Sequence, residues 1–235
     1  MSVYTLQPVC NQTVSLAVEG LLLDCDGVLV DSHDAAAVAW NRWAMKWAPG
    51  FDFHRDVEHG RRIGDLVAEL VREPRDVAIA VAELTQQELD CATGVDEIPG
   101  ARRFLDSCAG ARWAVVTSGN RALATARMAS AGLPSADVLV TSEDVENGKP
   151  FPDPYLIAAQ RLHLSPTRCA VFEDALAGVQ AARSAGVATI IGVGAAAAAA
   201  PVTLAVADMR GVRFDGSRLD VERDAILPQA DRDTG

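Results

Sequence analysis

Residues 20–32, GLLLDCDGVLVDS, form a segment in which an apolar run ends in two aspartates separated by one residue. A short apolar run closed by a glycine predicts a buried strand that leads into a turn. Because side chains of an extended segment alternate between two faces, Asp24 and Asp26 are expected to point the same way and Cys25 the other. The segment therefore predicts two carboxylates that converge at the end of one strand.

Two carboxylates that lie close together repel each other unless they share a proton or a cation. A divalent metal is the expected cation, and magnesium prefers one or two carboxylates together with water and phosphate oxygens. The same DxDG pattern also occurs in solvated turns and in calcium-binding loops. An EF-hand loop needs oxygen ligands through Val28 and Val30, which are apolar here, so we exclude that alternative.

From Pro99 onward the sequence alternates between helical and strand patterns. This alternation predicts an α/β fold with a parallel, doubly wound sheet. The expected helices cover residues 101–108, 121–131, 154–162 and 176–185, and the expected strands cover 113–117, 138–141, 169–172 and 188–192. Beyond them, we expect a loop over the alanine run 195–200, a last edge strand over 205–208 and a frayed tail from 218.

Residues 35–98 carry no strand signal and are expected to form an all-helical insertion after the first strand. Helices are predicted over 34–47, 61–72 and 77–91, with a loop over 53–60. Trp40, Trp43 and Trp47 follow helical spacing, which indicates a packing face. The expected domains are a discontinuous core (14–34 and 99–217), a helical cap (35–98) over the sheet's carboxyl edge, where open α/β sheets bind ligands, and terminal extensions (1–13 and 218–235).

Composition indicates a soluble protein that acts on small molecules. The 235 residues carry a formal net charge of −11, which argues against nucleic acid or an acidic membrane surface as a partner. The sequence shows neither a membrane-spanning run nor a basic start before a long apolar stretch, so a cytoplasmic location is expected. Five scattered cysteines without a CxxC pair are expected to be reduced thiols. The oligomeric state is left open, and a monomer is compatible with the sequence.

Polar residues follow the next predicted strand and could bind an anion. Thr117, Ser118, Gly119 and Asn120 form a hydroxyl-rich turn that enters a helix, as in many anion-binding turns. Capping of that helix by Ser118 or Asn120 is an equally good explanation of the turn taken alone.

Further charged residues follow two other predicted elements of the sheet. Lys149 is one of only two lysines in the chain, and Pro150 restricts it to an extended conformation, so we expect its charge to point inward. Glu173 and Asp174 end another strand, where Asp174 could cap the next helix or, with Glu173, serve the expected metal. The sequence thus places four carboxylates, a lysine and a hydroxyl along one sheet edge.

Four segments of the chain stand out as motifs: DCDGVLVDS from Asp24, VVTSGN from Val115, GKPFPDPY from Gly148 and VFEDALAGVQAARSAG from Val171. In order and spacing they resemble the signature motifs of the haloacid dehalogenase superfamily. The resemblance covers roughly residues 21–192, and four ordered motifs are far more specific than one. It implies a Rossmann-like core with a lid of the small helical type.

The resemblance implies roles for the acidic residues. Asp24 would be the nucleophile that attacks phosphorus and becomes an aspartyl phosphate. Asp26 would protonate the leaving alkoxide and then accept a proton from the hydrolytic water. The implied cofactor is Mg²⁺, held by Asp24, the backbone carbonyl of Asp26 and Asp174, with Glu173 as a second ligand or acting through water.

The same resemblance assigns the oxygens of the transferring phosphoryl group to Lys149 and Thr117, and Lys149 would also steady the Asp24 anion. The implied activity is magnesium-dependent hydrolysis of a small phosphomonoester, a sugar or polyol phosphate. Asp26 favours phosphoryl transfer over dehalogenation, because a dehalogenase of this superfamily has no alkoxide to protonate and lacks that aspartate.

Substrate selection is expected in the loop where His59, Gly60, Arg61 and Arg62 cluster at a helix start. Arginine there suits a second anionic or polyhydroxyl group, although a basic solvated face explains the cluster equally well. Three segments are similar to phosphatases of glycerol phosphate and 2-deoxyglucose 6-phosphate, namely HGRRIGDLVAEL (59–70), PGARRF (99–104) and WAVVTSGNRALATARM (113–128).

Two alternatives to a hydrolase are a phosphomutase similar to beta-phosphoglucomutase and a catalytically idle regulatory member of the superfamily. Such mutases carry a histidine twelve positions after the nucleophile, where this chain has Ala36. They also use a lid lysine, for which only Lys46 is available. The presence of every key acid and of Lys149 disfavours an idle member, so the sequence favours a hydrolase.

Overall fold

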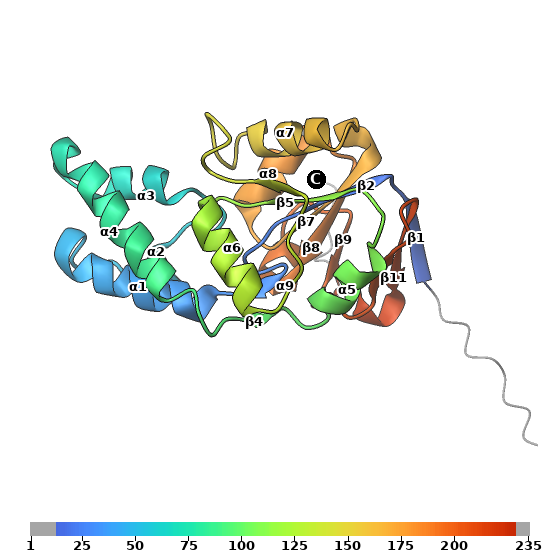
Figure 1. Cartoon of the computed structure of the whole chain (residues 1–235), viewed down its shortest axis with the longest axis horizontal. Coiled ribbons are helices and arrows are strands. Elements are labelled where there is room, and N and C mark those ends of the chain that lie inside the picture. Colours follow the sequence, from blue (N-terminus) through green and yellow to red (C-terminus); the bar gives the residue numbers. More distant parts are fainter. Residues whose placement is uncertain (1–12, 229–235) are drawn as a thin grey trace, which may run out of the picture.

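The computed structural model describes residues 13–228, with a six-stranded sheet at its centre (Figure 1). All neighbouring strands pair in parallel, in the order β6-β5-β2-β7-β8-β9. Their bounds are β2 Gly20–Leu23, β5 Trp113–Val116, β6 Val138–Val140, β7 Cys169–Glu173, β8 Thr189–Val193 and β9 Leu204–Val206. The predicted Rossmann-like, doubly wound α/β class is therefore confirmed.

Helices cover both faces of this sheet because its strands bury side chains on both sides. Leu21 and Leu23 of β2 pack in one core and Leu22 packs in the other. Phe104 of α5 and Met128 of α6 join the first core, and α7, α8 and α9 cover the opposite face. The bounds are α5 Ala101–Ser107, α6 Arg121–Ser130, α7 Asp153–Arg161, α8 Leu176–Ser184 and α9 Gly194–Ala198, with a 3₁₀ turn η2 at Pro166–Arg168.

Four helices form a block beside the sheet, which we call the helical insertion (residues 33–90; Figure 1). They are α1 His33–Trp47, α2 Phe53–Asp56, α3 Ile63–Leu70 and α4 Val77–Asp90, with a 3₁₀ turn η1 at Pro74–Asp76. The block has its own apolar core, in which Trp40 and Trp43 are buried, so the predicted tryptophan packing face is confirmed. The division of the chain into core and cap domains stays a prediction.

A two-stranded antiparallel ribbon, β3 Val30–Asp31 and β4 Asp96–Glu97, lies where the chain enters and leaves the helical insertion. Residues 35–98 were expected to hold no strand. That expectation was wrong at the end of the range, where β4 lies. The segment 53–60, expected to be a loop, begins with the short helix α2. Its Asp52 side chain accepts the backbone N–H of Arg55, a local cap that stabilises one turn.

The C-terminal part of the described chain is also more ordered than expected. β11 Arg218–Glu222 pairs antiparallel with β1 Thr13–Ala17 on one side and with β10 Val212–Phe214 on the other. The tail from 218 is therefore not frayed over this strand, because Leu219 and Val221 are fully buried in the core. The segment ends with the 3₁₀ turn η3 at Arg223–Ala225.

The alanine run contains the helix α9 instead of the expected loop, because Ala197 packs against β8. The last edge strand of the parallel sheet is β9, close to the predicted position. The thiols of Cys25, Cys91, Cys108 and Cys169 are free, and Cys10 lies outside the described residues. None of the helices within residues 13–228 combines the length and apolar character needed to span a bilayer.

Candidate active site

Three neighbouring strands bring residues that were predicted to be catalytic or to bind the metal to one edge of the sheet. Asp24 follows β2, Thr117 follows β5 and Asp174 follows β7, and these three strands are adjacent. The backbone N–H of Asp24 donates to the carbonyl of Phe172, which continues the β2–β7 pairing to Asp24. Asp24 and Thr117 are 4% and 3% exposed, so a rigid backbone and a packed environment fix both side chains.

Lys149 is buried at the centre of this edge. Its Nζ lies 2.8 Å from Asp24 Oδ1 and 2.5 Å from Glu173 Oε1, and it donates to the carbonyl of Val116 at 3.1 Å. Burial alone would lower the pKa of this lysine, but the Asp24 and Glu173 carboxylates raise it above its usual value. The lysine therefore stays charged and holds two carboxylates on either side of it.

The acidic residues at this edge form a compact oxygen cluster. One carboxylate oxygen each from Asp24, Glu173 and Asp174 lie within 4.8 Å of one another. Burial and the neighbouring Glu173 raise the pKa of Asp24 to about 7, and burial together with Asp24 raises the pKa of Asp174 well above its usual value. Burial is the largest cause of both shifts, and repulsion between the neighbouring carboxylates adds to it.

The donor set of this cluster suits a hard divalent cation. Glu173 Oε2 is buried without a hydrogen-bond partner, which is an oxygen with unused capacity to bind. Gly27 has a φ of +75°, and a Cβ there would lie 2.1 Å from Asp174 Oδ2, so only glycine leaves this carboxylate in place. Glu173 is also held by Tyr155, whose hydroxyl donates to Oε1, so its free oxygen is the one available to a metal.

The turn after β5 divides its functions among its residues. A pocket lies between this sheet edge and the helical insertion, and Thr117, Ser118 and Gly119 line it. The backbone N–H of Gly119 donates to Thr117 Oγ1 at 3.0 Å. The Asn120 side chain accepts the backbone N–H of Leu123 and caps α6, and Asn120 is not among the residues that line the pocket. Of the two explanations that the sequence left open for Asn120, capping is the one that the contacts show.

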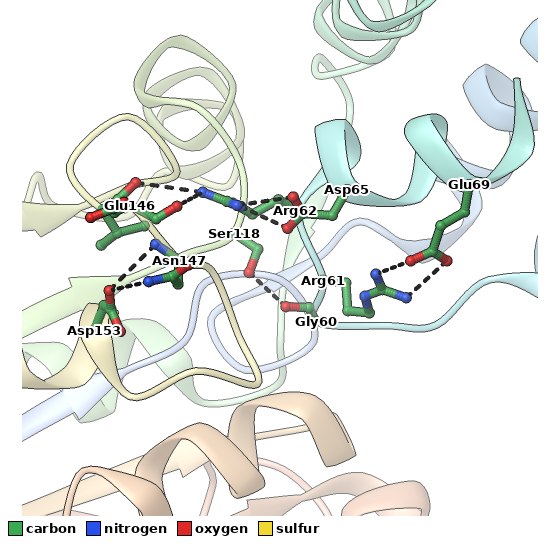
Figure 2. A network of polar contacts seen from close by, with 10 residues as sticks. Gly60, Arg61, Arg62, Asp65, Glu69, Ser118, Glu146, Asn147 and Asp153 are labelled. Carbon is green, nitrogen blue, oxygen red and sulfur yellow. Dashed lines mark hydrogen bonds and ion pairs between the residues drawn. The ribbon is translucent and has the colours of Figure 1, made fainter. Parts of the chain in front are cut away.

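The helical insertion closes the pocket from the opposite side. His59, Gly60 and Arg61 line it, and the Ser118 hydroxyl donates to the carbonyl of Gly60 at 2.6 Å (Figure 2). Arg61 points away from Ser118 and pairs with Glu58 and Glu69, with its side chain 18% exposed. The guanidinium predicted to bind substrate is thus held by two carboxylates of the insertion itself.

Arg62 makes a second contact between the insertion and the core. The Arg62 guanidinium donates two hydrogen bonds to Asp65, and Arg62 Nη1 donates to the carbonyl of Glu146 at 3.0 Å (Figure 2). The Arg62 side chain packs over Gly148, where a Cβ would come within 2.6 Å of it. The loop that carries Lys149 is therefore fastened to the insertion just before the lysine.

Several residues that sequence reasoning did not select also belong to the site. Arg127 and Glu88 are buried charged residues on α6 and α4, and Ser32 donates to Asp26 Oδ1 at 2.5 Å. His33 lies 3.6 Å from Asp174. Arg127 sits within the helical period of α6 and Glu88 within that of α4, so only the unusual placement of a charge on a buried helix face could have signalled them.

Comparison with known proteins agrees with this geometry. The family model of haloacid dehalogenase-like hydrolases matches residues 18–186. The chain is 39% identical over 172 residues to hexitol phosphatase A of Escherichia coli, covering 72% of this chain and 80% of that protein. It is 32% identical over 190 residues to glycerol-1-phosphate phosphohydrolase 2 of Saccharomyces cerevisiae, covering 75% of each.

A solved structure shows the same architecture. A hydrolase from Pseudomonas syringae superimposes with a TM-score of 0.67 at 26% identity, over 74% of this chain and 84% of that one. The family model spans the acid cluster, the turn after β5 and the lysine loop, which are the parts that form the sheet edge. The chain therefore belongs to the haloacid dehalogenase-like hydrolase family, as one of its phosphatase-type enzymes.

Proposed function

We propose that the protein is a magnesium-dependent phosphatase that hydrolyses a small sugar or polyol phosphate through an aspartyl phosphate on Asp24. The observation that carries the proposal is the buried contact of Lys149 with Asp24 inside an acidic cluster at the mouth of the sheet. A carboxylate fixed by a lysine and crowded by other acids is oriented for attack. The hexitol and glycerol phosphate specificities of the two relatives support the substrate class.

In the proposed first step, Asp24 attacks phosphorus in line with the leaving alkoxide. The Lys149 ammonium favours the anionic form of Asp24 and, with the Thr117 hydroxyl, binds equatorial oxygens of the phosphoryl group. Asp26 gives a proton to the alkoxide as the phosphorus–oxygen bond breaks. The helical insertion excludes bulk water from this step because it lines the other side of the pocket.

In the proposed second step, Asp26 takes a proton from water as that water attacks the aspartyl phosphate, which releases phosphate and restores Asp24. Asp24, Asp174 and the backbone carbonyl of Asp26 would hold Mg²⁺, with Glu173 Oε2 as a further ligand or a partner through water. The bound ion would supply positive charge that lets a phosphate dianion approach the carboxylates. The raised pKa values of Asp24 and Asp174 fit a cluster that needs this charge.

The experiment is a screen of phosphate release from hexitol, glycerol, sugar and glycolate phosphates, with magnesium and after chelation. We expect release from at least one polyol or sugar phosphate, dependent on added magnesium. Interconversion of glucose 1-phosphate and glucose 6-phosphate without release would instead support a mutase. Absence of both reactions over the whole panel would contradict an active enzyme of this substrate class and favour a binding role.

A further inference from the structure

Arg127 is a buried cation for which the proposed chemistry gives no role. It lies on α6, its side chain is 5% exposed, and it lines the pocket beside Asp26. Its Nη1 donates to Asp26 Oδ1 at 2.9 Å, and its Nη2 lies 3.7 Å from Glu88 Oε1 on α4. One guanidinium therefore joins the loop that carries the proposed acid to the helical insertion.

This arrangement is costly for the fold. Among residues 13–228, Arg127 Nε and Nη2 are buried without hydrogen-bond partners. Within the same range, Glu88 is 4% exposed and accepts one hydrogen bond, from the Trp40 indole N–H at 3.0 Å. Replacing buried ion pairs with apolar residues of similar volume is often neutral or stabilising, so stability alone gives no reason for an arginine here. A role in the reaction gives such a reason.

The contacts of Asp26 indicate what that role is. Oδ1 accepts both recorded hydrogen bonds, from Ser32 Oγ at 2.5 Å and from Arg127 Nη1 at 2.9 Å. None of the described residues donates a hydrogen bond to Oδ2. With Oδ1 occupied by two donors, the carboxyl plane is fixed, and Oδ2 is the oxygen left to carry a proton.

We propose that Arg127 is a positioning residue that fixes Asp26 Oδ1, so that Oδ2 delivers the proton to the leaving alkoxide. As the phosphorus–oxygen bond breaks, the proton moves from Oδ2 to the alkoxide oxygen, and Asp26 becomes a carboxylate still paired with Arg127. Glu88 balances part of the guanidinium charge and joins this contact to the insertion. The inference rests on the proposed phosphatase function and adds a residue to it.

The test compares two phosphate esters within each enzyme preparation, glycerol 1-phosphate and p-nitrophenyl phosphate. Glycerol leaves as a strongly basic alkoxide that needs a proton, whereas p-nitrophenolate leaves readily without one. The ratio of kcat/KM for the two esters cancels the fraction of active enzyme, so a loss of stability cannot imitate the effect. In addition, kcat/KM does not depend on the rate at which the aspartyl phosphate is later hydrolysed, so it reports the step in which the alkoxide leaves.

We expect Arg127→Lys and Arg127→Gln to lower the glycerol ester to aryl ester ratio at least about 10-fold, since general acid catalysis contributes roughly 10²–10⁴-fold. Asp26→Asn should lower this ratio the most, because it removes the proposed acid. Adding Arg127→Lys to Asp26→Asn should change the ratio no further. Arg121→Lys is the matched control, because Arg121 lies on the same helix and pairs with Asp144 at the surface.

Glu88→Gln separates the two contacts of Arg127. It should leave the ratio within about threefold, because the hydrogen bond from Arg127 to Asp26 remains. An unchanged ratio in both Arg127 variants, an equal change in Glu88→Gln, or a further change on the Asp26→Asn background would each overturn the inference while leaving the phosphatase proposal intact. If the wild-type protein hydrolyses neither of these esters nor any phosphate of the panel above, both proposals are overturned.

Discussion

The sheet edge and the helical insertion face the same pocket, but they hold their charged residues in different ways. At the edge, Lys149, Asp24 and Glu173 are buried, and the lysine Nζ lies within 2.8 Å of a carboxylate oxygen of each acid. In the insertion, Lys46 and Arg61 pair with carboxylates that remain exposed. Buried pairs cannot exchange their partners for water, whereas surface pairs are screened and cheaply replaced. We therefore expect the edge to set the chemistry and the insertion to adjust which substrates enter.

The largest expected difference concerns the nucleophile. Asp24→Asn should lower turnover at least about 10³-fold, because an amide cannot form the acyl phosphate and residues of one catalytic unit give losses of this size or more. Its melting temperature should stay close to that of the wild type. Asp34→Asn, an exposed aspartate in the first turn of α1, is the control and should keep turnover within about twofold. Measured hydrolysis near the wild-type rate in Asp24→Asn would remove Asp24 from its assigned role.

The two lysines of the chain allow a direct comparison of the two regions. Lys149→Met should destabilise the fold by about 3–5 kcal/mol, since it leaves Asp24 and Glu173 buried without their cation. Lys46→Met breaks an exposed pair with Glu83 and should cost at most about 1 kcal/mol. Urea denaturation of both variants measures the difference. Equal destabilisation would mean that the buried pair does not set the stability of the edge.

Two glycines provide a smaller contrast. Gly27→Ala should weaken activation by magnesium, since its Cβ would displace the Asp174 carboxylate at a backbone φ of +75°. Gly64→Ala in α3 meets no atom within 4 Å and should stabilise the fold by about 0.4–1 kcal/mol. Magnesium titration of activity and thermal melting of both variants test this pair. Normal magnesium activation of Gly27→Ala would argue against Asp174 as a ligand.

Arg61 tests whether the insertion selects substrates. Arg61→Ala should change the ratio of rates for hexitol and glycerol phosphates by a few-fold while leaving the slower of the two measurable, because one charged contact is worth about 1 kcal/mol. The ratio of kcat/KM values for the two esters is the measurement. If the ratio is unchanged, the Glu58 and Glu69 pairs of Arg61 are its only task and selection lies elsewhere.

His59 gives the smallest expected effect, on stability against pH. Burial, together with the nearby His33 and His54, lowers the pKa of His59 below its ordinary 6.5. Below that pH the unfolded chain binds a proton that the folded chain refuses, so acidification destabilises the fold. His59→Gln should reduce the fall in melting temperature between pH 7 and pH 5. A fall identical to that of the wild type would show that this histidine titrates normally.

Sequence patterns located the sheet edge because its strands are buried on both faces and end in polar residues. The apolar run before Asp24 and the strand before Glu173 carried unambiguous signals, and parallel pairing then brought their ends together. The motif around Lys149 added a resemblance that periodicity could not supply. Spacing alone thus predicted the layout of the edge, while the roles of its residues stay predictions until they are measured.

The insertion side was harder to predict, because contacts between distant helices leave no local pattern. Arg127 and Glu88 look like ordinary helix residues in the sequence. The two partners of Arg127, Asp26 and Glu88, lie 101 and 39 positions away from it along the chain. The alanine run lacks the polar caps that mark a helix, but alanine is a strong helix former, and Ala197 of α9 packs against Gly192 of β8. β11 was missed although its charged residues alternate with Leu219 and Val221, a pattern typical of a half-buried strand, because the prediction gave more weight to the charge of the segment.

The pairing of β1 with β11 has a consequence for biosynthesis. Thr13 lies opposite Glu222, so the first described strand can pair only after a segment about 200 residues further along the chain has been synthesised. Until then β1 has an unpaired edge that could associate with another chain. We expect nascent chains that end before β11 to be more prone to aggregate, and to need chaperones longer, than chains that contain it.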